Sequence, residues 1–117
     1  MSLDRRDADY LDHMQEAIAK IQRYTSHKCE ADFLADELAQ DGVIRNLEIL
    51  GEAVSKLSPA LKARHADIPW KAISGMRNRL IHGYLSVNMT IVWDTVVNLL
   101  PELLGKLRMI RQILGPQ

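Results

Sequence analysis

The segment RNRLIHGY, Arg77 to Tyr84, places an arginine, an asparagine, a histidine and a tyrosine within eight residues. A histidine with its ordinary pKa of about 6.5 exchanges a proton at neutral pH, and arginine carries a permanent charge on a fork that fits phosphate oxygens. RNA cleavage without a metal needs both groups, because the ribose 2′-OH must lose its proton and the charge developing on the phosphoryl oxygens must be held. Asn78 would orient the histidine or a phosphate, and Tyr84 would stack on a base or donate its hydroxyl.

The spacing of Arg77 and His82 constrains where such a site can form. Residues five apart on a continuous α-helix are separated by about 140°, so the two side chains would not share a face. If the helix ends near His82, with Gly83 as a left-handed cap, the histidine can turn toward the arginine. The same residues also fit a helix C-terminus that is rich in cations because the helix dipole favours them there. Spacing alone leaves both interpretations open, and in either one Leu80 and Ile81 are expected to anchor the segment in the core.

The helices that position this segment are predicted from apolar residues recurring at steps of three and four. A proline inside the last helix, Pro101, should kink or divide it, since an interior proline costs about 3 kcal/mol. No segment shows the alternation of a strand. We therefore expect an all-α, four- to five-helix up-and-down bundle. The expected helices are Asp7 to His27, Phe33 to Ala39 with Asp41-Gly42 as its exit, Val43 to Leu57, a turn at Ala60 to Arg64, a stretch from Ile68-Pro69 into the motif, and one from the N-cap Asn88 to Leu114.

The composition bounds the class of protein. With 117 residues and 47% hydrophobic content, the chain suits a single domain, residues 1–117, with one core. The lone Cys29 excludes an internal disulfide, and no metal or cofactor motif is present. No signal peptide and no apolar run of about 18 residues occur, so we expect a cytoplasmic protein without a membrane partner.

The formal net charge is zero, so the chain lacks the excess positive charge of non-specific nucleic-acid binders. The charge is unevenly distributed along the chain. Residues 1–58 hold 7 basic and 12 acidic side chains, a net charge of −5, and residues 59–117 hold 8 and 3, a net charge of +5. An anion-binding surface is therefore expected in the second half. Packing of acidic helices against basic ones would also explain the asymmetry.

The motif resembles that of the HEPN domains (higher eukaryotes and prokaryotes nucleotide-binding), and within them the HepT-like toxins. Their motif is arginine, four residues, histidine, one residue and tyrosine, which Arg77, His82 and Tyr84 match without a gap, and Asn78 follows the arginine as it usually does in that family. Two further stretches are similar to the family: RNLEILGEAVSKL, residues 45–57, and the segment from residue 88 to 101 after MRNRLIHGY. The resemblance covers nearly the whole chain.

The resemblance implies a helical homodimer whose two motifs face a shared cleft, and a metal-independent endoribonuclease in which Arg77 and His82 carry catalysis on an RNA substrate. It also implies a toxin of a type VII-like toxin–antitoxin system, paired with a minimal, MntA-like nucleotidyltransferase. That antitoxin would transfer AMP to the motif tyrosine, Tyr84, making O-AMP-tyrosine. The added bulk and negative charge would block the place of the RNA phosphate.

Several interpretations stay open beside this one. Glu52 either pairs with Arg77 or Arg79 and orients the arginine, or is an exposed carboxylate. Arg45 and Glu48 are interpreted as a solvated pair, and Trp70 and Trp93 as core or interface residues. The alternative function is a non-catalytic, nucleotide-binding adaptor that partners a nucleotidyltransferase, and a third is a purely structural helical dimer.

Overall fold

A computed structural model describes residues 6–82 and 88–115, with the backbone alone for Arg77 and for residues 79–82. Every element in these ranges is helical, which confirms the all-α prediction. The elements are α1 (Arg6–Thr25), α2 (Glu30–Leu34), α3 (Glu37–Lys56), α4 (Pro59–Arg64), α5 (Trp70–His82), α6 (Met89–Asp94), the π-helical segment η2 (Thr95–Leu99) and α7 (Leu100–Leu114).

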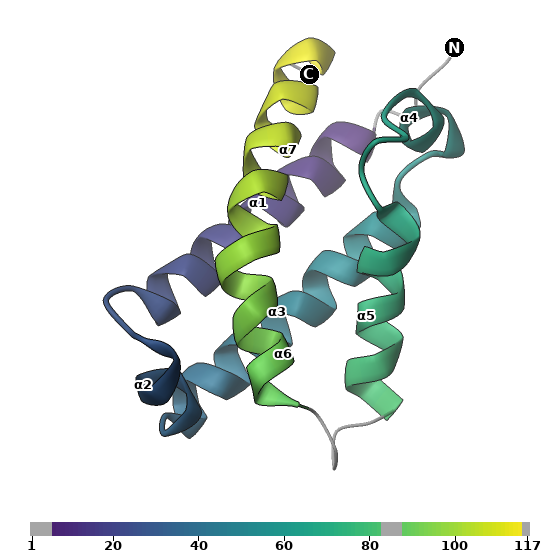
Figure 1. Ribbon diagram of the computed structural model, residues 1–117. Helices are drawn as coiled ribbons and strands as arrows, with labels where there is room; N and C mark the ends of the chain where they lie inside the picture. Colours follow the sequence, from purple (N-terminus) through teal and green to yellow (C-terminus); the bar gives the residue numbers. More distant parts are fainter. Residues whose placement is uncertain (1–5, 83–87, 116–117) are drawn as a thin grey trace.

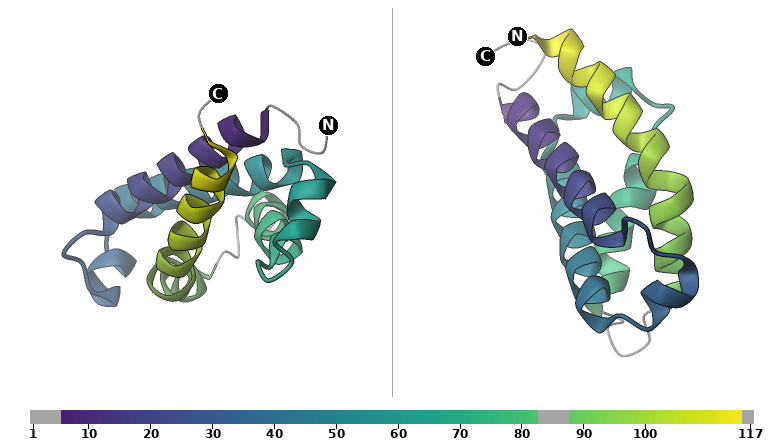
Figure 2. Two further views of the ribbon diagram at one scale, coloured as in Figure 1. Left: turned by 90° about the horizontal axis from the view of Figure 1, so that it is seen from above. Right: turned by 90° about the vertical axis from the view of Figure 1, so that its left-hand side faces the viewer.

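The long helices surround one core (Figure 1). Helix α3 packs along both α1 and α5, and α7 packs on α1 (Figures 1 and 2). The core comes from the apolar stripes predicted from the sequence, since each presents one face of a helix inward. Its largest fully buried side chains include Phe33, Leu11, Met14, Ile18, Ile21, Leu47, Leu50, Leu61, Ile73, Leu100, Leu107 and Val43.

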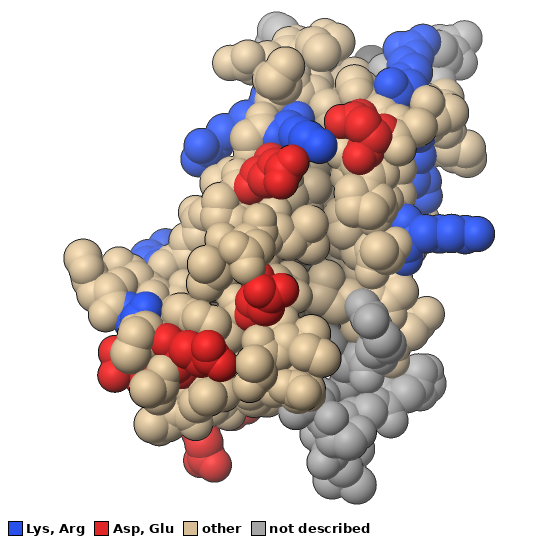
Figure 3. All heavy atoms as spheres, in the orientation of Figure 1, with Lys and Arg blue, Asp and Glu red and all other residues tan. Residues whose placement is uncertain are grey.

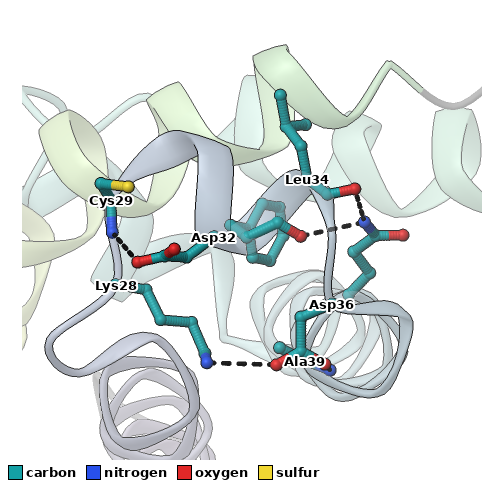
Figure 4. A network of polar contacts seen from close by, with 8 residues as sticks. Lys28, Cys29, Asp32, Leu34, Asp36 and Ala39 are labelled. Atoms are coloured by element: carbon teal, nitrogen blue, oxygen red, sulfur yellow. Dashed lines mark hydrogen bonds and ion pairs between the residues drawn. The ribbon is translucent and has the colours of Figure 1, made fainter.

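The helix expected at Phe33 to Ala39 is wrong, because the chain divides there into two helices. Asp36 is the N-cap of α3, and its Oδ1 accepts a hydrogen bond of 3.0 Å from the Ala39 amide. Lys28 forms an ion pair of 3.1 Å with the same carboxylate (Figure 4). The Gln40 side-chain amide donates to the carbonyls of Phe33 and Leu34 at the end of α2, at 2.9 and 3.1 Å. These bonds satisfy polar groups at the two helix ends, which is why the chain can break between them.

Gly42 does not end a helix, contrary to the prediction. It lies inside α3, where an added Cβ would stand 2.9 Å from Cδ2 of Tyr24 on α1. The glycine is therefore present because α1 and α3 approach closely at this point.

The remaining helix boundaries follow local signals. Ser58 caps α4 by accepting from the Leu61 amide at 3.2 Å, and the expected turn is thus a short helix. Asn88 caps α6 as predicted, accepting from the amides of Thr90 and Ile91 at 2.9 and 3.2 Å.

The last helix is divided as predicted from Pro101. A π-helical segment, η2, lies between α6 and α7, and Pro101 occupies the first turn of α7. The proline has no amide to donate and its ring crowds the preceding turn, so a wider turn before it relieves the conflict.

Candidate active site

The motif residues from Arg77 to His82 lie in the last part of α5, which ends at His82. The end of α5 and the start of α6 lie at the same end of the bundle (Figure 1). The helix is described as far as His82, and the expected helix end beside this residue stays a prediction. Gly83, predicted to cap this helix, lies outside the described residues.

One motif side chain, that of Asn78, is described, and it is exposed to solvent. The side chains of Arg77, Arg79 and His82 lie outside the described part, as does all of Tyr84. The predicted approach of His82 to Arg77 thus stays a prediction, and so do the anchoring roles of residues 80 and 81.

Glu52 lies on α3, the helix that packs against α5. Its carboxylate is 43% exposed and forms an ion pair of 3.7 Å with Lys56, one turn along the helix. The neighbouring Gly51 is buried. Glu52 therefore lies at the surface and is half-buried. Its pairing with Arg77 or Arg79 stays a prediction.

A surface cavity of about 430 Å³ lies against Glu52, between α1 and α3. It brings cations, carboxylates and one phenol together, although the two helices are far apart in sequence. Sequence reasoning singled out three of its members but missed the contributions of α1. The lining residues include Tyr10 and His13 from α1 and Arg45, Glu48, Glu52 and Lys56 from α3.

Arg45 and Glu48 are not the solvated pair expected from the sequence. The two described side chains form no ion pair, and both line this cavity, Arg45 exposed and Glu48 half-buried. Their spacing on α3 could have shown that they share a face with Glu52, but the facing helix α1 could not be inferred from it.

Both tryptophans are core residues, as predicted. Trp70 is buried, and its Nε1 donates to the carbonyls of Lys62 and His65 at 3.1 and 3.0 Å. Trp93 is half-buried, with its ring 5.4 Å from that of Phe33.

The two signs of charge gather in different regions of the surface. Figure 3 shows acidic side chains over α2 and the start of α3, and basic ones along the side formed by α4 and α5. The helix that carries the motif therefore lies on the more basic side, where a polyanion is attracted. Among the described residues, no three His, Cys, Asp or Glu side chains are grouped as metal ligands would be.

Comparison with known proteins identifies the family. The family described as ribonuclease HepT-like matches residues 14–110, most of the chain. The chain belongs to the HepT-like ribonucleases. This confirms the predicted resemblance to the family. Residues 45–57 and the segment from Arg77 to Tyr84 lie inside the matched range.

Two relatives show the extent of the similarity. A protein named "Probable ribonuclease HepT" from Thermococcus cleftensis is 40% identical over 110 residues, which cover 94% of this HepT-like chain and all of the relative. A "Putative RNase" from Caldanaerobacter subterraneus subsp. tengcongensis is 40% identical over 104 residues, 88% of this chain and 92% of the relative. No solved structure matches the chain. Within the described ranges, no helix has the length and apolar character needed to cross a bilayer.

Proposed function

We propose that this chain is the ribonuclease toxin of a toxin–antitoxin pair and that it cleaves RNA without a metal ion. The match to HepT-like ribonucleases over residues 14–110 carries the proposal, because the matched range includes Arg77 and His82. Two features of the described chain support it. The residues from Arg77 to His82 lie in the last described part of α5, and this helix lies on the basic side of the molecule.

Arg77 and His82 would act on the ribose and the phosphate at the RNA bond that is cleaved. His82 takes the proton of the 2′-OH as the 2′-oxygen attacks the adjacent phosphorus, and Arg77 holds the charge that grows on the phosphoryl oxygens. The bond from phosphorus to the 5′-oxygen breaks, and that oxygen receives a proton from an acid. The products are a 2′,3′-cyclic phosphate and a 5′-hydroxyl. Asn78, Arg79, Glu52 and Tyr84 would orient these groups or the RNA.

A homodimer is part of this proposal. One arginine and one histidine supply a base and an anion site but leave the acid unassigned. A second copy whose motif faces the same cleft would provide the acid, as a two-fold axis presents the same residues twice.

The activity is tested with protein purified free of any co-expressed nucleotidyltransferase. We expect a labelled RNA to be cut in the presence of EDTA, leaving a 2′,3′-cyclic phosphate. His82→Ala and Arg77→Ala should each slow cleavage at least about 100-fold. His65→Ala, at the C-cap of α4, and Arg23→Ala, in the last turn of α1, are the matched controls. RNA left intact by the parent protein, or cut equally fast by His82→Ala, would overturn the enzyme assignment.

The same proposal includes an antitoxin that transfers AMP to Tyr84. In that reaction the tyrosine oxygen attacks the α-phosphorus of ATP and pyrophosphate leaves. Co-expression with a cognate minimal nucleotidyltransferase should add about 329 Da per AMP and abolish RNA cleavage. Tyr84→Phe should prevent both effects, whereas Tyr10→Phe and Tyr24→Phe should not.

The adaptor alternative predicts a different result. An adaptor would bind the nucleotidyltransferase equally well after Arg77→Ala and His82→Ala, and no RNA preparation would be cut.

A further inference from the structure

The chain is strongly basic between Glu52 and Asp94. Residues 53–93 contain six Lys or Arg side chains and one acidic residue, Asp67, a net charge of +5. The Asp67 carboxylate forms an ion pair of 3.3 Å with Lys106 on α7, so its charge is balanced from outside this segment. Figure 3 shows the basic side chains spread along α4 and α5. A polyanion is therefore attracted along the length of α5 and not only to the motif at its end.

Two cations of this segment are available to a ligand. Arg64, at the end of α4, and Lys71, at the start of α5, are exposed and form no ion pair within the described part of the chain. The other described cations of the segment are occupied. Lys56 is in the ion pair with Glu52, and Lys62 donates to a backbone carbonyl of α3 at 3.2 Å.

Arg64 and Lys71 are held at one corner of the molecule. The Nε1 atom of Trp70, the first residue of α5, donates to the carbonyls of Lys62 and His65 at the end of α4. Figure 1 shows α4 next to the start of α5. Because these two bonds tie one helix to the other, the two free cations have a fixed relation to α5.

Lys71 is placed where it does not stabilise its own helix. It is the second residue of α5, and the positive end of the helix dipole disfavours a cation in the first turn. No acidic residue of that turn compensates for it. A free, exposed lysine at an unfavourable position is explained if it binds an anion from outside the chain.

A line along α5 leads from Lys71 to the motif. Gly75 and Asn78 follow Lys71 by four and seven positions and therefore share its face, and the backbone position of His82, eleven residues on, continues the line. Lys71 and Asn78 are exposed, whereas Ile73 on the opposite face is buried. A Cβ added at Gly75 would meet no described atom within 4 Å, so the helix surface is low at this point and a ligand backbone can lie close to it.

We propose that the RNA strand on one side of the cleaved bond lies along this line and that Lys71 and Arg64 bind its phosphates. The inference rests on the proposed function, because the cleaved bond must lie at the motif end of α5. From Lys71 to His82 the line is about 16 Å long, which about five stacked nucleotides span at about 3.4 Å each. Phosphate contacts carry no sequence information, so these two positioning residues would increase the affinity for a long strand without selecting its bases.

RNA binding tests the two cations without requiring cleavage. The full chain carrying His82→Ala is titrated into a labelled single strand of about 12 nucleotides, and fluorescence anisotropy is followed at several salt concentrations. Adding Lys71→Ala or Arg64→Ala should weaken binding about three- to tenfold and reduce the slope of log K against log salt by about 0.7 each. Lys71→Arg should bind like the parent, because it keeps the charge.

The matched control is Arg108→Ala, which removes an exposed cation of α7 that has no ion pair within the described chain. Lys71→Ala should also leave Tm unchanged or raise it, because it removes a cation from the first turn of a helix. Weaker binding caused by loss of structure would instead lower Tm. Binding by Lys71→Ala and Arg64→Ala that is as tight as binding by Arg108→Ala would overturn the proposal.

Cleavage by the protein with His82 intact tests where the strand lies. A substrate of about four nucleotides, cut in its middle, is too short to reach from the motif to Lys71, about 16 Å away. Extending it on the 5′ side or on the 3′ side should lower KM in one of the two directions and leave kcat unchanged. Lys71→Ala should abolish this gain and cleave the short substrate like the parent.

The outcomes separate this inference from the proposed function. A gain in neither direction, or an equal loss on short and long substrates, would contradict the assigned path of the strand. A parent protein that cleaves no RNA would overturn the proposed function, and the binding measurement would still decide whether Lys71 and Arg64 hold a nucleic-acid strand.

Discussion

Asp7 and Ser58 join the start of α1 to the start of α4, across 51 positions of sequence. The fully buried Asp7 carboxylate accepts from the Ser58 amide at 2.9 Å and from the Ser58 hydroxyl at 2.6 Å. Ser58 in turn caps α4. One carboxylate therefore holds a helix cap in place, and it is buried with partners for both of its oxygens.

Removing this carboxylate should destabilise the fold. We expect Asp7→Ala to lower the free energy of unfolding by about 2–3 kcal/mol, because two partly buried donors on Ser58 lose a charged acceptor. Urea denaturation followed by circular dichroism measures the change. Asp9→Ala, at an exposed position in the same turn, should alter it by less than about 0.5 kcal/mol. Equal losses for the two variants would contradict the assigned role of Asp7.

Gly42 should resist replacement by alanine. The added Cβ would stand 2.9 Å from the Tyr24 ring, so we expect a loss of about 1–3 kcal/mol, although alanine favours helix more than glycine does. In a Tyr24→Ala background, Gly42→Ala should instead stabilise the protein, because only the helix preference remains. Gly75→Ala on α5, where a Cβ meets no described atom, is the control and should be neutral or stabilising. Chemical denaturation of the four variants tests this coupling.

The Asp36 cap should make stability depend on acid. The Ala39 amide, and then Lys28, lower the pKa of Asp36 below its ordinary value of 3.8. A lowered folded-state pKa means that the stabilisation is complete above about pH 4 and is lost as the pH falls through the lower folded value. The Tm difference between the parent and Asp36→Ala should thus be largest near neutral pH and shrink below pH 4. A difference that stays constant from pH 7 to pH 2 would argue against the charged cap.

Two roles are open for Glu52, an orienting partner of Arg77 or Arg79 in the proposed site and a surface carboxylate. If it orients the arginine, Glu52→Gln should slow RNA cleavage roughly tenfold with little change in Tm, since a misplaced catalytic group costs rate more than stability. Glu48→Gln, in the same cavity, is the matched control and should cleave like the parent. A positioning role should change the pH profile of cleavage in Glu52→Gln, whereas a purely structural role should leave this profile unchanged. Equal rates for the two variants would leave Glu52 as a surface carboxylate paired with Lys56.

The helix boundaries that carry local end signals could be predicted from the sequence. Asn88 and Pro101 act on backbone groups within about one turn, so the cap of α6 and the division before α7 were predictable. The motif from Arg77 to His82 could also be recognised from the sequence, because its residues lie close together in the chain. This motif led to the family. The break at Asp36 was missed, although its cap is local, because the apolar pattern continues across it.

Features that depend on two helices far apart in the sequence could not be predicted before the packing of these helices was known. Gly42 reads as a helix exit until Tyr24 of α1 is placed against it. The cavity beside Glu52 exists because α1 brings Tyr10 and His13 to α3, and Asp7 can be buried because Ser58 reaches it. Local propensity acts over a few residues, whereas close approach, burial and hydrogen-bond satisfaction depend on how whole helices pack.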